Sequence, residues 1–400
     1  MPNESAAAPP SRRSVRPPIV LRLPRRLVYS VVMVALVYAI AEGALRVRRA
    51  LIDGRRAARP YSFASVTRDG VPLDDEGGAI PFASDPHLVY RPRGPQALGP
   101  VTLASDGFRG PERALAKPAG TRRVVVLGGS AAFGMHASGD ERVFTALLEA
   151  RLDAAARAVG GRVEVLNRAV IGYDSTQELV LLATELVDLA PDVVVLFDGW
   201  NDFYGSGLAA ADADAFVHPK FVKDDRRRGR AAAQPFLEWL RGFELVRAID
   251  DGIARQAAKA GSAGPLGDFH DRSALAVPRY ARNVRAMVRI ARAYGAATLV
   301  APQPELFSRG ETPPEEQEMR RKREKDGYSP WSRLAWPQFV AAAAAVAAEE
   351  GVPFVDSVRA FAGHDDVLFH DFVHFNDRGN ELLAAHLAPA VAGLLGLAVH

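Results

Sequence analysis

The chain has 400 residues, of which 48% are hydrophobic and 24% are charged, a composition typical of a folded protein with a large core. Its formal net charge is only +3, and no basic face with interleaved aromatic residues is visible, so no nucleic-acid partner is expected. The chain has no cysteine, which excludes disulfides, thiolate catalysis and cysteine-based zinc sites.

The N-terminal region predicts a membrane anchor. Residues 1–26 are rich in proline, serine and arginine and are expected to be disordered. Residues 27–45 form an almost unbroken apolar run, just long enough for a helix to cross a bilayer. A cleaved signal peptide ending near Ala39-Ile40-Ala41, a twin-arginine export signal and a buried soluble helix are the alternatives. Arginines flank the run on both sides, so they do not set its orientation. Because such anchors most often export the following domain, we expect an extracytoplasmic, periplasmic body.

The segment after the apolar run predicts little regular structure. Proline and glycine are frequent in residues 46–104, which we interpret as a linker and an irregular lead-in. The segment Asp106–Gly110 is expected to be a structured turn at the entrance to the main domain, which we place at residues 105–397.

Short apolar strands then alternate with helices. Five strands are predicted at residues 122–127, 163–166, 193–197, 298–301 and 352–355. Helices are predicted at residues 141–159, 176–189, 278–294, 331–350 and 377–395. This alternation implies βαβ units, a parallel sheet and the α/β fold class. Two segments break the rhythm: residues 203–278 are interpreted as an inserted cap or lid, and residues 308–330 as a charged, mobile loop.

A hydroxyl group follows the first strand directly. Gly128 and Gly129 let the backbone turn sharply after the strand, and Ser130 comes next. Ser130 therefore stands at the carboxyl end of a parallel strand, where open α/β sheets place their ligands. Taken alone, the stretch fits a tight turn with a capping serine equally well.

The other strands also lead to candidate functional residues. Gly172 lies in the loop after the second strand, Asn201 follows the third, and Asp371 and His374 lie beyond the fifth. Since the carboxyl ends of parallel strands share one edge of a sheet, these residues are expected to meet Ser130. A nucleophilic serine needs a histidine base, and a carboxylate fixes the tautomer of that histidine. The N–H groups of Ser130 and Gly172 and the side-chain amide of Asn201 are candidate oxyanion donors.

Together these blocks resemble the SGNH (GDSL-type) hydrolase superfamily, which is named for Ser, Gly, Asn and His in chain order. The matching blocks are Gly128-Gly129-Ser130, Asn167 to Tyr173, Gly199-Trp200-Asn201-Asp202 and Asp371-Phe372-Val373-His374. The segments Asp106 to Glu112 and Gln303-Pro304 are similar to segments of membrane-attached members. The resemblance implies a flavodoxin-like three-layer α/β/α sandwich with a five-stranded parallel sheet. It also implies ester cleavage by acyl transfer to Ser130.

One position departs from the family pattern. An aspartate usually precedes the serine of the first block, whereas this chain has Gly129. The change removes a possible hydrogen bond in the turn and leaves the three predicted catalytic residues in place.

Other interpretations of the C-terminal block remain open. His370 with Asp366 forms a rival dyad for Ser130. The histidines and aspartates of residues 364–374 also resemble metal ligands, but no H-E-x-x-H helix is present, so no metal is expected. The glycine motifs of nucleotide-binding loops are absent as well, so no cofactor is expected.

The sequence thus predicts a membrane-anchored serine ester hydrolase that acts on a small acyl ester or an acylated glycan. A cell-envelope polysaccharide O-acyltransferase or deacetylase would use the same acyl-enzyme and is one alternative. A non-catalytic binding module that retains the fold is the other.

Overall fold

The structure is a computed structural model. It describes residues 25–56, 65–66, 72–73, 82–85, 87–208, 243, 267–324 and 328–398. Residues 1–24 of the predicted disordered segment 1–26 and most of the predicted insertion at residues 203–278 lie outside these ranges, whereas Arg25 and Arg26 are helical. The proposed domain boundaries therefore stay predictions.

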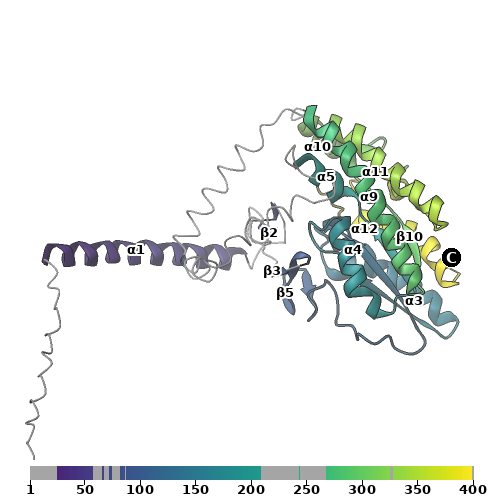
Figure 1. Cartoon of the computed structure of the whole chain (residues 1–400), viewed down its shortest axis with the longest axis horizontal. Coiled ribbons are helices and arrows are strands. Elements are labelled where there is room, and N and C mark those ends of the chain that lie inside the picture. Colours follow the sequence, from purple (N-terminus) through teal and green to yellow (C-terminus); the bar gives the residue numbers. More distant parts are fainter. Residues whose placement is uncertain are drawn as a thin grey trace, which may run out of the picture.

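The core is a parallel sheet of four strands (Figure 1). The strands are β7 (Thr121–Gly128), β8 (Arg162–Asn167), β9 (Val193–Phe197) and β10 (Ala297–Val300). Their order across the sheet is β8–β7–β9–β10, and every neighbouring pair is parallel. All five residues of β9 are buried, as expected for an apolar strand that is covered on both faces.

The expected fifth strand is reduced to one isolated parallel bridge between Val300 and Phe354, so the prediction of five strands was wrong by one. Val300 donates to the Pro353 carbonyl at 3.0 Å, and Val355 donates to the Val300 carbonyl at 2.9 Å. Because Pro353 has no N–H group, the ladder cannot extend through it. With this segment beside β10, the order follows the 2-1-3-4-5 arrangement of flavodoxin-like folds. The α/β fold class is confirmed.

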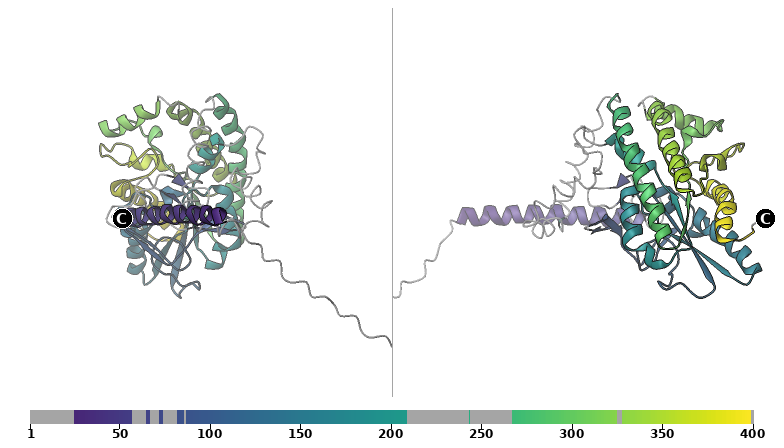
Figure 2. Two further views of the ribbon diagram at one scale, coloured as in Figure 1. Left: turned by 90° about the vertical axis from the view of Figure 1, so that its left-hand side faces the viewer. Right: turned by 45° about the vertical axis from the view of Figure 1, so that its right-hand side comes forward.

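Helices cover both faces of the sheet. On one face, α3 (Phe144–Ala158) packs against α12 (Asp377–Leu395). On the other face, α9 (Gly267–Ala293) packs against both α4 (Ser175–Thr184) and α11 (Tyr328–Glu350). Figure 2 shows α9 and α11 running side by side. The result is the expected three-layer sandwich, with helices at each place where the sequence predicted one.

The charged segment 308–330 was predicted to be a mobile loop, and this prediction was wrong. Residues Pro314–Glu324 form helix α10. Proline occupies the first helical position, acidic residues lie in the first turn, and basic residues lie in the last turn. This order suits a helix because it complements the partial charges at the two helix ends.

The lead-in was expected to be irregular, but it contains short antiparallel strand pairs. These are β1 (Ser65–Val66) with β2 (Pro72–Leu73), β3 (Phe82–Asp85) with β4 (Val89–Pro92), and β5 (Gln96–Leu98) with β6 (Val101–Leu103). The buried Tyr90 of β4 donates its hydroxyl to the Ile171 carbonyl at 2.8 Å. This hydrogen bond ties the lead-in to the loop that follows β8.

The N-terminal helix α1 spans Arg25–Arg56 and lies apart from the sheet (Figure 1). Within it, the 19 residues Tyr29–Val47 are long and apolar enough to cross a membrane. The apolar side chains of this stretch are exposed, with Val34 at 70% and Ile40 at 65%. The stretch fits a membrane span, a signal anchor or a signal peptide.

Candidate active site

Ser130 begins the short helix α2 (Ser130–Phe133), directly after the central strand β7. The turn before it requires glycine, because a β-carbon on Gly128 would lie 2.4 Å from the Phe197 carbonyl oxygen. Strands β8 and β9 lie on opposite sides of β7, so the order in which successive strands join the sheet reverses here. Crevices at such a point are where open α/β sheets bind their ligands.

Three of the predicted site residues form a continuous hydrogen-bonded chain. The Ser130 Oγ lies 2.7 Å from the His374 Nε2, and the His374 Nδ1 lies 2.7 Å from the Asp371 Oδ2. The other carboxylate oxygen of Asp371 accepts the N–H groups of Val373 and His374 at 2.8 Å each. A ring whose Nδ1 donates to a carboxylate has its Nε2 lone pair free to accept the serine proton.

The charge of Asp371 is stabilised within this chain. Burial acts to raise its pKa, but the charge of His374, its hydrogen bond and the two backbone donors outweigh burial. The pKa of Asp371 is therefore held well below its usual range. At neutral pH the carboxylate is ionised and holds the His374 ring in one orientation.

Asn201 lies in the first turn of α5 (Trp200–Leu208) and reaches the turn before Ser130. Its Nδ2 donates to the Tyr173 carbonyl at 2.6 Å. A β-carbon on Gly129 would lie 2.3 Å from the same nitrogen. The Asn201 amide therefore occupies the space beside Gly129, and one of its two hydrogens is left for another acceptor.

Gly172 lies in the loop after β8 with a φ of +76°, a left-handed conformation that glycine adopts without strain. A hydrogen bond of 3.0 Å from the Tyr173 N–H to the Val170 carbonyl closes this turn. The Val170 N–H donates in turn to the Gly128 carbonyl at 3.1 Å. The loop is thus fastened to the turn that carries Ser130, and the role of Gly172 as an oxyanion donor stays a prediction.

The structure brings His374 to Ser130, and not the rival dyad of His370 with Asp366. The carboxylate of Asp366 pairs with Arg378 at 3.3 Å. The exposed ring of His370 stacks on the ring of His136, with 3.8 Å between the ring centroids.

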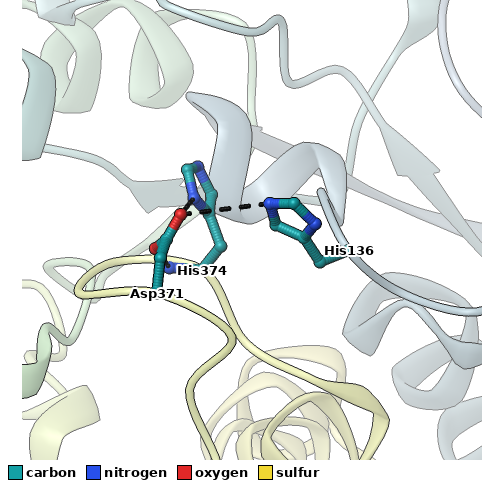
Figure 3. A group of neighbouring side chains, drawn as sticks. All are labelled: His136, Asp371 and His374. Atoms are coloured by element: carbon teal, nitrogen blue, oxygen red, sulfur yellow. Dashed lines mark hydrogen bonds and ion pairs between the residues drawn. The ribbon is translucent and has the colours of Figure 1, made fainter. Parts of the chain in front are cut away.

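His136 lies at the site although the sequence did not indicate it. Its side chain is 5% exposed, and its Nε2 lies 3.9 Å from the Asp371 Oδ2 (Figure 3). Its backbone has a φ of +68°, which is uncommon outside glycine. Burial, followed by the charges of His374 and His370, lowers the pKa of His136 to about 3. The ring is therefore neutral at neutral pH. No motif spacing relates it to the C-terminal block, so only the fold reveals it.

A buried ion pair supports the loop that carries Asp371 and His374. Arg309 pairs with Glu316 of α10, and their side chains are 1% and 0% exposed. The Glu316 Oε1 also accepts the backbone N–H groups of Leu368 at 2.7 Å and Phe369 at 3.0 Å. Helix α10 is therefore part of the scaffold of the site.

Arg109 holds the helix that carries Ser130. Its buried guanidinium donates to the carbonyl oxygens of Phe133 at 3.2 Å and Gly134 at 2.7 Å, at the end of α2. A cation suits this position because the carbonyl end of a helix is negative. The guanidinium also pairs with Asp140 at 2.7 Å. The predicted turn at residues 106–110 is thus ordered and supports the site.

The fold and the residues at its switch point are those of an SGNH-type hydrolase. The chain belongs to the GDSL-like Lipase/Acylhydrolase family, whose family model matches residues 126–382. This match runs from β7 into α12 and confirms the resemblance that the sequence blocks indicated. In its general class the protein is an ester hydrolase.

The chain is similar to several solved structures. TesA is 19% identical, and the match covers 68% of this chain and 99% of TesA with a TM-score of 0.37. A lipase/acylhydrolase from Enterococcus faecalis is 18% identical, with 70% and 98% covered and a TM-score of 0.39. A variant of Axe2, an acetyl xylan esterase from Geobacillus stearothermophilus, is 14% identical, with 70% and 96% covered and a TM-score of 0.39. No curated protein sequence matches the chain significantly.

Proposed function

We propose that this protein hydrolyses an acyl or acetyl ester through a covalent acyl-enzyme on Ser130. The observation that carries the proposal is the chain of two 2.7 Å hydrogen bonds that joins Ser130 to His374 and His374 to Asp371. A serine is a weak nucleophile until an adjacent base removes its proton, and this chain supplies the base together with its orienting carboxylate.

In the proposed mechanism, the Ser130 Oγ attacks the ester carbonyl carbon while the His374 Nε2 takes the hydroxyl proton. The tetrahedral intermediate collapses, the bond to the alcohol oxygen breaks, and His374 returns the proton to the leaving alcohol. Water then attacks the acyl-enzyme with His374 again as base, which releases the acid and restores Ser130. Asp371 stays ionised throughout and stabilises the imidazolium.

The oxyanion of the intermediate needs hydrogen-bond donors. We assign this role to the Ser130 N–H, which has no partner within its helix because it lies at the helix start, and to the second amide hydrogen of Asn201. Gly172 is the third donor that the sequence predicts. Loss of one such donor costs roughly 2.7–4 kcal/mol of transition-state stabilisation.

The proposal includes a membrane anchor formed by α1. Its support is the exposed apolar stretch Tyr29–Val47, since apolar surface of this extent marks a contact with lipid or protein. We place the hydrolase domain on the extracytoplasmic side, where acylated glycans and small acyl esters are candidate substrates. The full chain should remain in the membrane pellet after an alkaline carbonate wash, and its release into the supernatant would contradict the anchor.

The substitution Ser130→Ala tests the nucleophile. We expect it to lower kcat for a short chromogenic acyl ester by at least about 10³-fold and to abolish fluorophosphonate labelling. The thermal unfolding midpoint should change little, because among the described residues the serine hydroxyl has one hydrogen-bond partner, the His374 ring. Wild-type turnover in the purified variant would overturn the assignment. In the same assay, His374→Gln should inactivate the enzyme, whereas His370→Gln should not.

A further inference from the structure

His136, Asp371 and His374 together present the donor atoms of a metal site (Figure 3). The Asp371 Oδ2 lies 3.9 Å from the His136 Nε2 and 2.7 Å from the His374 Nδ1. One donor atom from each residue lies within 4.8 Å of the other two. Two imidazole nitrogens and one carboxylate oxygen are a set that zinc binds readily. We propose that these residues bind a zinc-like divalent cation and that the bound ion inhibits the hydrolase.

The two donor spacings around the Asp371 Oδ2, 3.9 Å and 2.7 Å, are close to those of a zinc site. Tetrahedral zinc with ligand distances of 2.0–2.2 Å holds neighbouring donors roughly 3.3 Å apart, about 0.6 Å from both spacings around Asp371. The other oxygen of Asp371 is held by the N–H groups of Val373 and His374, so the Oδ2 remains directed at the two rings. The Asp371 side chain is 34% exposed, so solvent reaches this residue, and we expect a water molecule as the fourth ligand.

The backbone conformation of His136 is uncommon outside glycine. This residue adopts a left-handed φ of +68°, yet its side chain is 5% exposed and directed at the Asp371 carboxylate. Strained non-glycine residues persist where the surroundings over-determine their position, and they gather at functional sites. In the mechanism proposed above His136 has no task, so its placement beside the carboxylate calls for a separate one.

Metal at this position would block the base by reversing the tautomer of His374. With the cation on Nδ1, the single ring proton of the neutral imidazole moves to Nε2, so the ring neither gains nor loses a proton. The Nε2 then donates to the Ser130 Oγ and cannot accept the serine proton. The cation lies on the Asp371 side of the ring, opposite Ser130, so kcat should fall while KM stays unchanged.

The test uses the full chain in detergent, with two readouts. The first is the rate of hydrolysis of a short acyl ester, measured without Zn²⁺, with Zn²⁺, and again after a chelator is added. The second is direct metal binding, measured by the visible absorption of Co²⁺, which replaces zinc in such sites. For wild-type protein we expect at least a tenfold, chelator-reversible fall in kcat. His136→Asn should bind Co²⁺ at least tenfold more weakly than the wild type. Inhibition of this variant by Zn²⁺, measured against its own metal-free rate, should also be at least tenfold weaker. Asparagine tolerates the left-handed backbone, so this variant should fold.

His386→Asn is the matched control, because the one hydrogen bond of its ring among the described residues goes to the Asp356 carbonyl, at 3.1 Å. It should bind and respond to metal as the wild type does. Unchanged metal binding in His136→Asn, or inhibition that raises KM alone, would overturn the inference. Inhibition rests on the proposed function, but Co²⁺ binding does not. A protein that binds Co²⁺ through His136 without hydrolysing esters would therefore contradict the proposed function and leave the metal site standing.

Discussion

At Gly129 the missing side chain determines where Asn201 can lie. The Asn201 amide nitrogen occupies the space that a β-carbon on residue 129 would need, 2.3 Å away, and is held there by the Tyr173 carbonyl. A larger residue at position 129 and the amide compete for one volume in a closely packed turn. The departure from the family pattern is thus coupled to the placement of a proposed oxyanion donor.

We therefore expect Gly129→Ala to displace the Asn201 amide and to lower kcat by about 10²-fold, the loss typical for one oxyanion donor. The measurement is steady-state hydrolysis of a short acyl ester. Gly161→Ala is the matched control, since the nearest atom to its β-carbon would be 3.6 Å away, an ordinary contact. Equal activity in the two variants would contradict this role of Gly129.

Residues that follow strand ends could be predicted from the sequence, and residues placed by packing could not. Ser130, Asp371 and His374 each carry a local signal, because each lies beyond the end of an apolar strand. His136 carries none: it approaches Asp371 only because the segment after α2 folds back onto the C-terminal loop. The contact between Gly129 and Asn201 depends on packing between two segments in the same way.

Among the elements, α10 shows how charge can mislead. Its dense charges suggested a solvated loop, yet Glu316 is fully buried, pairs with Arg309 and accepts two backbone N–H groups from the loop of the proposed base. A sequence does not reveal which of several neighbouring charges will find a buried partner. The signals at the helix ends were readable, and they describe this segment better than its overall polarity does.

Glu316→Gln should destabilise the protein by about 3–5 kcal/mol, because it leaves the buried guanidinium of Arg309 without its counter-charge. Urea unfolding measures this loss. Glu318→Gln is the control in the same helix, where an exposed pair with Arg321 contributes at most about 1 kcal/mol. Similar unfolding midpoints for the two variants would show that the buried pair does not support the fold.

The sheet itself was predicted well where strands are long and apolar, and less well elsewhere. Strands β7, β8, β9 and β10 all lie where the apolar runs predicted them. The short strands of the lead-in have only two to four residues each, too few to display the alternation of apolar and polar residues that predicts a strand. The prediction of a fifth strand failed because Pro353 interrupts the hydrogen bonding of that segment.

At the scale of the whole molecule, one cluster consists of carboxyl groups that interact electrostatically and are each at most 3% exposed: Asp174, Glu178, Asp198 and Asp202. Burial, with the nearby carboxylate of Asp174, raises the pKa of Asp202 to about 7. Burial also raises the pKa of Asp198 to about 6 and that of Glu178 well above its usual value. The folded protein therefore holds protons that the unfolded chain releases.

The sign of the pH effect follows from these raised pKa values. Stability from protonated carboxyl groups is present below the unfolded pKa and is lost as pH rises through the folded pKa, from about pH 4 to 7. We expect Glu178→Gln, which cannot ionise, to lose less stability than the wild type between pH 5 and pH 8 in urea unfolding. His136, whose lowered pKa acts in the opposite sense, is common to both proteins and cancels in the difference. Parallel pH profiles would contradict the prediction.

The separation of 244 positions between Ser130 and His374 has a consequence for synthesis. At 5–20 residues per second, a ribosome needs about 12–50 s to travel from one to the other. Throughout that interval the nascent chain holds an ordinary, unactivated serine, and under the proposed mechanism it can cleave nothing. Under this mechanism the newly made chain is inactive until the C-terminal loop docks beside Ser130. A chain released before that loop is translated would, by the same mechanism, be inactive.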